Sequence, residues 1–201
     1  MPLYLIPTLL LKNASRPYEV KIKDRIFNAE ELKGVDFSNT SFTSCHFAGQ
    51  KLRFVNFRYS YFHNCDFSNA LLNGVSFDGC IFEDSKLNWI NFVDTILKNC
   101  QFKSSLLEAV TFDGNDLTTS NFQNLVLSNS FFNKCKLIKV VFDHCKLESC
   151  VFYKSDLSKA NLTTSTTIGA TFDESRVKGC QLNLESIIDF GLSKGFVFKV
   201  E

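Results

Sequence analysis

The 201-residue sequence lacks the motifs that mark the common enzyme folds. No two cysteines have the CxxC spacing of zinc and redox sites, and no Walker A, GxGxxG, GxSxG or HExxH motif occurs. The chain also has only three prolines, one methionine and one tryptophan. The missing motifs favour a protein that is not an enzyme, and we predict no catalytic residue, no metal ligand and no cofactor.

Net charge and long apolar runs are also missing. The sequence has 22 Lys or Arg against 21 Asp or Glu, so no overall field attracts nucleic acid or an anionic membrane. The apolar segment at residues 3–11 contains Pro7 and follows no basic residue. It is too short to span a bilayer and is a poor signal peptide. We therefore expect a cytoplasmic protein that contacts neither a membrane nor nucleic acid directly.

Phenylalanine is the residue in excess, and it recurs at every fifth position. From Phe37 to Leu182, thirty consecutive positions five residues apart hold sixteen Phe, twelve Leu, one Val and one Thr, without an insertion. Two residues before these positions, 26 of the thirty residues are Ala, Ser, Thr, Val or Cys, and all eight cysteines occupy this slot. Because the slot selects for small size, we expect the cysteines to be buried packing residues with free thiols.

A period of five fits neither a helix nor a strand. It fits a chain that turns a corner every five residues and points one large and one small residue inward from each side. Segments such as CDFSN (65–69), SDLSK (155–159) and ANLTT (160–164) show the pattern most clearly. The chain resembles the pentapeptide-repeat family over about residues 20–184. It departs from that family at the second slot, where only eight of thirty residues are Asp or Asn.

The resemblance implies an all-β fold, a right-handed quadrilateral β-helix with short terminal caps. Four pentapeptides make one turn, so thirty repeats make seven and a half turns, each stabilised by its neighbours. Residues twenty apart would then stack along the axis. One such core ladder comprises Phe42, Phe62, Phe82, Phe102, Phe122 and Phe142.

Three parts follow from this reading: an N-terminal segment and cap (1–34), the coil (35–184) and a C-terminal helix and strand (185–201). Alternating apolar residues at 18–22 indicate a capping strand, 184–190 a short helix ended by Gly191, and 195–200 an edge strand. The last two either cap the coil or also join two copies. The predicted dimer tail comprises Ile187, Ile188, Phe190, Phe196 and Phe198.

Some outward slots hold apolar residues where polar ones are expected. We predict a candidate contact surface at Trp89, Leu106, Val126, Phe131 and Val151. A basic stripe is expected at Lys134, Lys136, Lys139, Lys154 and Lys159. The three histidines occupy outward slots far apart, so we interpret them as solvent-facing polar residues.

Within the family, the chain is similar to the Qnr-type and the microcin- and albicidin-immunity proteins, which bind DNA gyrase and topoisomerase IV as mimics of duplex DNA. The similarity rests on the small whole-length coil, on KIKDRIF (21–27) and on ESIIDFGLSKGFVFKV (185–200), which resembles their dimer tail. It implies a homodimer that confers quinolone or toxin resistance by binding gyrase.

A second hypothesis is a general protein-interaction rod, such as a signalling partner or a module of a bacterial effector. The coil from 35 to 182 has fourteen Lys or Arg and fourteen Asp or Glu, so it is neutral. A DNA mimic would be acidic, because duplex DNA carries one negative charge per ~1.7 Å of its axis. Outward apolar residues suit the interaction rod, and both hypotheses stay open.

Overall fold

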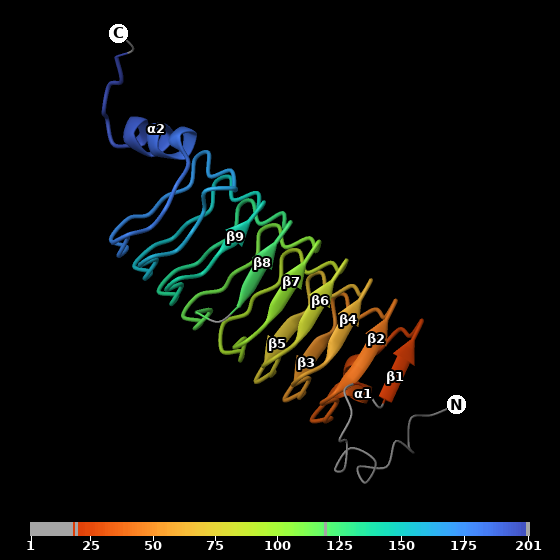
Figure 1. The fold of residues 1–201 in the computed structure, drawn as a ribbon. Coiled ribbons are helices and arrows are strands. Elements are labelled where there is room, and N and C mark those ends of the chain that lie inside the picture. Colours follow the sequence, from red (N-terminus) through yellow and green to blue (C-terminus); the bar gives the residue numbers. More distant parts are fainter. Residues whose placement is uncertain (1–17, 19, 119, 200–201) are drawn as a thin grey trace.

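The chain winds into a rod of stacked four-sided turns (Figure 1) in a computed structural model that describes residues 18, 20–118 and 120–199. One side holds a seven-stranded sheet of order β1-β2-β4-β6-β7-β8-β9, and another holds the pair β3-β5. All strand pairs are parallel and join residues twenty apart, as Val20 and Thr40 do. The predicted all-β coil with four pentapeptides per turn is therefore confirmed.

The strands are short because each occupies one side of one turn. They are β1 (Val20–Lys23), β2 (Thr40–Thr43), β3 (Lys51–Arg53), β4 (Tyr61–His63), β5 (Leu71–Asn73), β6 (Ile81–Glu83), β7 (Gln101–Lys103), β8 (Asn121–Gln123) and β9 (Phe142–Asp143). The helices are α1 (Ala29–Leu32) and α2 (Leu184–Ser193). We number the sides in chain order from β2: the first side has Phe42 on the axis, the second Phe47, the third Leu52 and the fourth Phe57.

The corners between sides use left-handed backbone. The residue two positions after the axis residue has a positive φ at nearly every described corner, as at Asn39 (59°) and Gly49 (68°). At many corners a backbone hydrogen bond joins residues three apart, for example from the N–H of Ser60 to the carbonyl of Phe57 at 3.1 Å. Asn, Asp and Gly suit this conformation, whereas a bulky residue there is strained.

The axis of the coil is filled by the large residues of the repeat. Each axis residue from Phe27 to Phe172 is buried except Leu72, which is partly exposed. Along the first side, consecutive rings from Phe42 to Phe142 stack at centroid distances of 4.9 to 5.5 Å. Stacked and edge-to-face rings add to the free energy gained by burying their area.

The small slot carries polar groups that bond to the turn below. The Ser60 hydroxyl donates to the carbonyl of Phe37 at 2.8 Å, and the Cys80 thiol donates to the carbonyl of Phe57 at 2.9 Å. Serine and cysteine therefore make the same contact, which explains why they alternate in this slot.

All eight cysteines are free thiols, and seven of them are buried, while Cys180 is partly exposed. Burial raises the pKa of Cys145 to about 11 and the pKa of both Cys135 and Cys150 to about 12. A thiol must ionise to attack or to bind a metal, so Cys135, Cys145 and Cys150 pack rather than react.

The amino-terminal end differs in detail from the expectation. The predicted capping strand is observed as β1, but it keeps the twenty-residue register and so forms part of the first turn. The sequence reading missed α1. Its signal was a capping box, in which Asn28 accepts from the N–H of Glu31 while the Glu31 carboxylate accepts from the N–H of Asn28.

At the other end, α2 lies across the last turn of the coil (Figure 1). Gly191 does not end the helix, which continues to Ser193 and stops before Gly195, whose φ is +84°. The predicted edge strand is not formed over residues 196–199, because this segment has no strand beside it to pair with. Val200 lies outside the described residues.

Candidate interaction surfaces

The five outward apolar residues predicted as a contact surface meet around one corner of the coil. Leu106 and Val126 stack on the second side, and Phe131 and Val151 stack on the third side. Trp89 occupies the corner column between these two sides. We call this group the corner patch.

The corner patch is open to solvent. Trp89 is 58% exposed, whereas Leu106 and Phe131 are each a little over 40% exposed. Trp89 also has a positive φ of 57°, which is unfavourable for a bulky residue. Val126 and Val151 are partly exposed, so the patch presents apolar side chains to solvent on several successive turns.

The inner face of α2 closes the carboxyl-terminal end of the coil. Phe190 packs edge-to-face on Phe172 with ring centroids 5.9 Å apart. The N–H of Gly169 donates to the Asp189 carboxylate at 2.8 Å. In earlier turns the equivalent N–H donates to a carbonyl of the next turn, as Ser149 does to Ile168. Lys194 pairs with Asp173 of the last turn. Phe190 and Asp189 therefore serve the cap.

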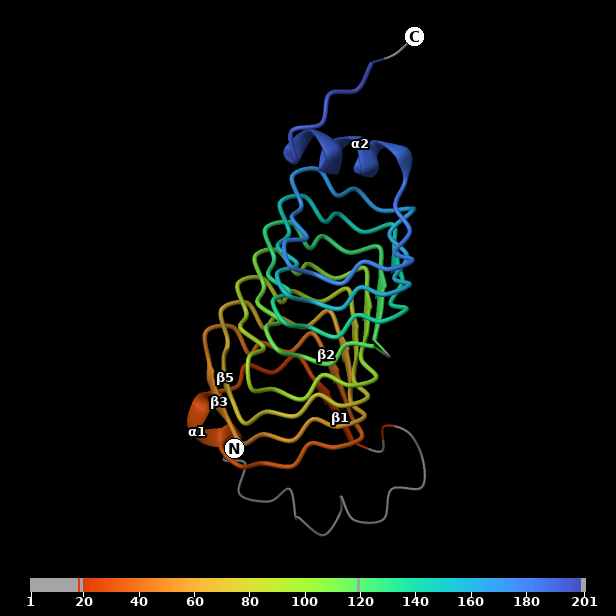
Figure 2. The same ribbon diagram turned by 90° about the vertical axis from the view of Figure 1, so that its left-hand side faces the viewer.

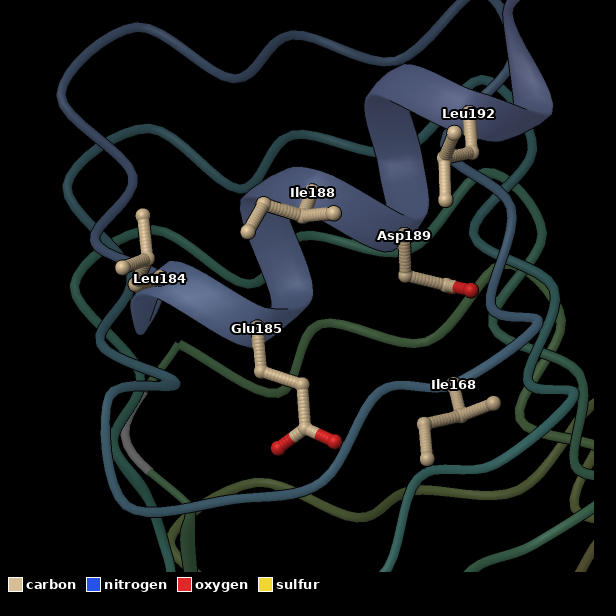
Figure 3. Close-up of a pocket in the computed structure, with 6 residues that line it drawn as sticks. All are labelled: Ile168, Leu184, Glu185, Ile188, Asp189 and Leu192. Atoms are coloured by element: carbon tan, nitrogen blue, oxygen red, sulfur yellow. The ribbon is translucent and has the colours of Figure 1, made fainter. Parts of the chain in front are cut away.

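The outer face of α2 carries an apolar stripe that the sequence reading missed in part. Figure 3 shows Leu184, Ile188 and Leu192 spaced along the helix, with Ile168 on the turn below. These residues, with Glu185 and Asp189, line a cavity of about 540 Å³. The signal for Leu184 and Leu192 was their spacing of four residues from Ile188.

The other predicted tail residues lie around this stripe. Ile187 is exposed, and Phe196 is 67% exposed. Phe198 leans back on the helix, because a Cβ at Gly191 would lie 2.6 Å from its Cζ. The structure thus brings Ile187, Ile188, Phe196 and Phe198 to one end of the molecule, with Phe190 turned inward.

Charged residues are spread over all four sides. Glu83 lies on the first side, Glu148 on the second, Asp113 on the third and Asp78 on the fourth. A DNA mimic would require its acidic residues to be gathered on one side. Those of the described coil are not.

The predicted basic stripe borders the fourth side, and part of it is neutralised. Lys136 pairs with Asp116 at 3.5 Å, and Lys154 pairs with Glu174 at 3.4 Å. Exposed pairs of this kind contribute little to the free energy of unfolding.

The histidines form no joint site. The Nδ1 of His63 lies 3.7 Å from the Asp84 carboxylate, and the Nδ1 of His144 lies 2.8 Å from that of Asp143. Among the residues that the structure describes, no group of three His, Cys, Asp or Glu side chains could hold a metal ion. Within the same residues, no helix is long and apolar enough to cross a membrane.

Solved structures similar to the chain share its coil. Two trypsin-treated variants of QnrB1, a plasmid-mediated fluoroquinolone resistance protein, match with TM-scores of 0.62 and 0.58. Their sequence identities are 18% and 17%, and each match covers 90% of this chain and 98% of the other. Rfr23, a pentapeptide repeat protein from the cyanobacterium Cyanothece 51142, matches with a TM-score of 0.49 and 18% identity over 54% of this chain and 88% of its own.

None of the curated proteins compared with the chain matches it significantly. Two family models do match. The model of the pentapeptide repeat region matches residues 55–132, and the model of pentapeptide repeats in eight copies matches residues 31–69 and 127–163. Together they extend over residues 31–163, where the five-residue register and the stacked turns are observed. The chain belongs to the pentapeptide-repeat family.

Proposed function

We propose that this protein is a non-catalytic rod that binds a protein partner through the corner patch. The observation that supports this most is Trp89, an exposed aromatic residue in a strained corner position, with Leu106 and Phe131 exposed on later turns of the two adjacent sides. Tryptophan is the residue type that most often dominates the free energy of protein binding. Eight free thiols suit the reducing cytoplasm, where we place the protein.

A photo-crosslinking amino acid placed at Leu106 or at Val151 should capture one and the same protein in cells. Trp89→Ala should reduce that capture, since loss of a central aromatic residue costs more than ~2 kcal/mol of binding free energy. The matched control is the crosslinker at Lys98, an exposed position on the fourth side. Equal capture from Lys98 would show that the corner patch is not the binding surface.

A second candidate partner is DNA gyrase or topoisomerase IV. It is favoured by the likeness of the whole coil to QnrB1, which extends to nearly the full length of both chains. The spread of acidic residues over all four sides speaks against mimicry of DNA. Purified protein should inhibit gyrase supercoiling or relieve quinolone-stabilised cleavage if this candidate holds, and added salt should weaken the effect. No change at a large excess of protein would leave the first candidate.

We also propose that two copies associate through the outer face of α2. Leu184 and Leu192 are 72% and 55% exposed, and a two-fold axis would bury both stripes against each other. Leu192→Glu should convert the dimer to a monomer in light scattering, whereas Gln181→Glu, an equal charge change at an exposed site, should not. A wild-type chain that is monomeric at high concentration would disprove the dimer.

A further inference from the structure

We propose a second binding site on the third side of the coil, near its amino-terminal end, for an acidic peptide segment that carries one bulky apolar side chain. The site lies between β3 and β5, which pair in parallel as Leu52 with Leu72. In Figure 2, α1, β3 and β5 lie along one edge of the coil, opposite β1 and β2. The site lies one turn before Trp89, since the N–H of Asn69 donates to the carbonyl of Asn88, but it is lined by none of the corner-patch residues. It goes beyond the function proposed above.

The floor of this site is an axis residue that the coil wall does not cover. Leu72 is the one partly exposed residue on the axis between Phe27 and Phe172. Leu71, next to it on β5, is 57% exposed. Together with Lys51, Arg53, Phe54 and Asn73, the two leucines line a cavity of about 700 Å³. We call this cavity the β3–β5 pocket.

Phe54 forms an apolar wall of the pocket at a cost to the backbone. Its φ is +54°, an unfavourable value for an aromatic residue, and its side chain is 64% exposed. The ring lies against the next turn, where a Cβ at Gly74 would come within 2.7 Å of its Cδ1. The ring packs over Gly74, yet most of it stays exposed beside Leu71 and Leu72, where its apolar surface is available to another molecule.

The rim of the pocket is basic. Lys51 and Arg53 are exposed, and neither forms an ion pair within the described part of the chain. Lys33 lies beside them, because the N–H of Gly34 donates to the carbonyl of Arg53 at 2.9 Å. The carboxylate of Glu31 on α1 pairs with Arg25 at 3.6 Å instead. This rim therefore carries positive charge that a ligand can neutralise.

Charge and shape together select the occupant. The cavity volume falls in the range of small-molecule sites, so it has room for an aromatic side chain, and Leu72 and Phe54 give it an apolar floor and one apolar wall. The cations stand beside it, where they can pair with carboxylates on either side of an inserted side chain. An extended peptide with a phenylalanine or tryptophan flanked by acidic residues meets both demands at once.

The test uses a short fluorescein-labelled peptide with one phenylalanine flanked by glutamates, titrated with the full-length protein in fluorescence anisotropy. We expect saturable binding that weakens with salt. Replacing the peptide phenylalanine by alanine, or making Arg53→Glu in the protein, should weaken binding by roughly tenfold or more. Phe54→Asn should act likewise. Thermal unfolding of each variant verifies that it is folded.

Two matched controls separate the pocket from general effects. Tyr59→Asn removes another exposed aromatic residue from the same corner slot, where Tyr59 has a φ of 59° and lies over Gly79. Lys98→Glu reverses an exposed charge on the fourth side. Both should bind the peptide like the wild type.

Several results would overturn the proposal. One is the absence of saturable binding, and another is equal binding of the alanine peptide. Inhibition by N-acetylphenylalanine at the same concentration as by the peptide would point to a small-molecule site instead. Dissociation of a dimer by Arg53→Glu would assign the pocket to a second copy of this chain. Each of these results leaves the corner patch, which has its own crosslinking test, unaffected.

Discussion

The two halves of the coil share one backbone register but fill it differently. In the amino-terminal half, from Phe27 to Phe82, phenylalanine occupies the axis on the first, second and fourth sides, and leucine occupies the third. In the carboxyl-terminal half, from Phe92 to Phe152, phenylalanine occupies the first and third sides, and leucine the other two. Rings in the first half therefore meet edge-to-face around the turn, as Phe57 and Phe62 do at 5.3 Å.

This difference shows that the repeat dictates the backbone while Phe and Leu exchange on the axis, since Leu32 and Leu52 on the third side are buried as fully as the phenylalanines. The third side changes from leucine to phenylalanine between Leu72 and Phe92, and Leu72 is the axis residue left partly exposed. Cores tolerate such exchanges as long as the total volume is kept. The pocket lies at the point of this change.

The largest effect should come from truncating a ring in the axis. Phe62→Ala and Phe102→Ala should each lower the free energy of unfolding by about 3–5 kcal/mol, since a repeating backbone cannot collapse onto the cavity. The loss should be larger for Phe62→Ala, because rings from three sides of the coil surround Phe62. Phe102 contacts rings from only two sides. Urea denaturation measures both.

The control for these variants is Lys103→Ala, which changes an outward side chain next to Phe102. It should leave the denaturation midpoint nearly unchanged. Equal shifts for Phe102→Ala and Lys103→Ala would mean that the five-residue register assigns the wrong residues to the axis.

Much of this fold could be predicted from the sequence, because the five-residue repeat predicts which residues point inward. The position of Phe102 in its ladder and the burial of Cys80 both follow from counting. The helical turn at α1 and the inward turn of Phe190 could not be predicted that way, because the ends of the coil have no repeat to read. The pocket at Leu72 was missed because the repeat pattern predicts the same burial for every axis leucine, as observed for Leu52.

A second prediction concerns alkaline pH and the buried thiols of the carboxyl-terminal half. Burial raises the pKa of Cys150 from 9.0 to about 12, so the folded state keeps this proton after the unfolded chain has lost it. The contribution is fully present below pH 9 and is lost as the pH rises toward 12. Between pH 9 and pH 11, Cys150→Ser should reduce the loss of stability by roughly 2–3 kcal/mol relative to the wild type.

This comparison is made as unfolding curves at several pH values for both proteins. Cys180→Ser is the matched control, since Cys180 is only partly buried and its pKa is raised less. Identical pH dependence of the Cys150→Ser variant and the wild type would contradict the assignment of a buried, protonated thiol.

A third prediction compares two leucines on the axis. Leu107 is fully buried, and Leu107→Ala should cost about 2–5 kcal/mol. Leu72→Ala should cost only about 1–2 kcal/mol, because solvent already reaches Leu72 through the β3–β5 pocket. Chemical denaturation of the two variants in parallel decides the matter, and equal costs would show that the pocket is closed in solution.

A fourth prediction concerns the small slot. Cys65→Ser should cost only about 1 kcal/mol. One turn later, Ser85 occupies the same slot, and its hydroxyl donates to the carbonyls of Phe62 at 3.3 Å and Glu83 at 3.0 Å. A serine at 65 would find the matching carbonyls of Phe42 and His63, to which the thiol now donates at 3.6 and 3.5 Å. A loss as large as that of a truncated ring would mean that the thiol has a role beyond size.

The smallest effect on stability should come from Phe54→Asn, although the residue removed is a large aromatic one. Its ring is 64% exposed, so little buried area is lost. Asparagine tolerates the φ of +54° better than phenylalanine does, and this relief offsets the lost contact with Gly74. We expect the free energy of unfolding to change by no more than about 0.5 kcal/mol. A larger loss would mean that Phe54 supports the fold, and its strained position would then need no ligand to explain it.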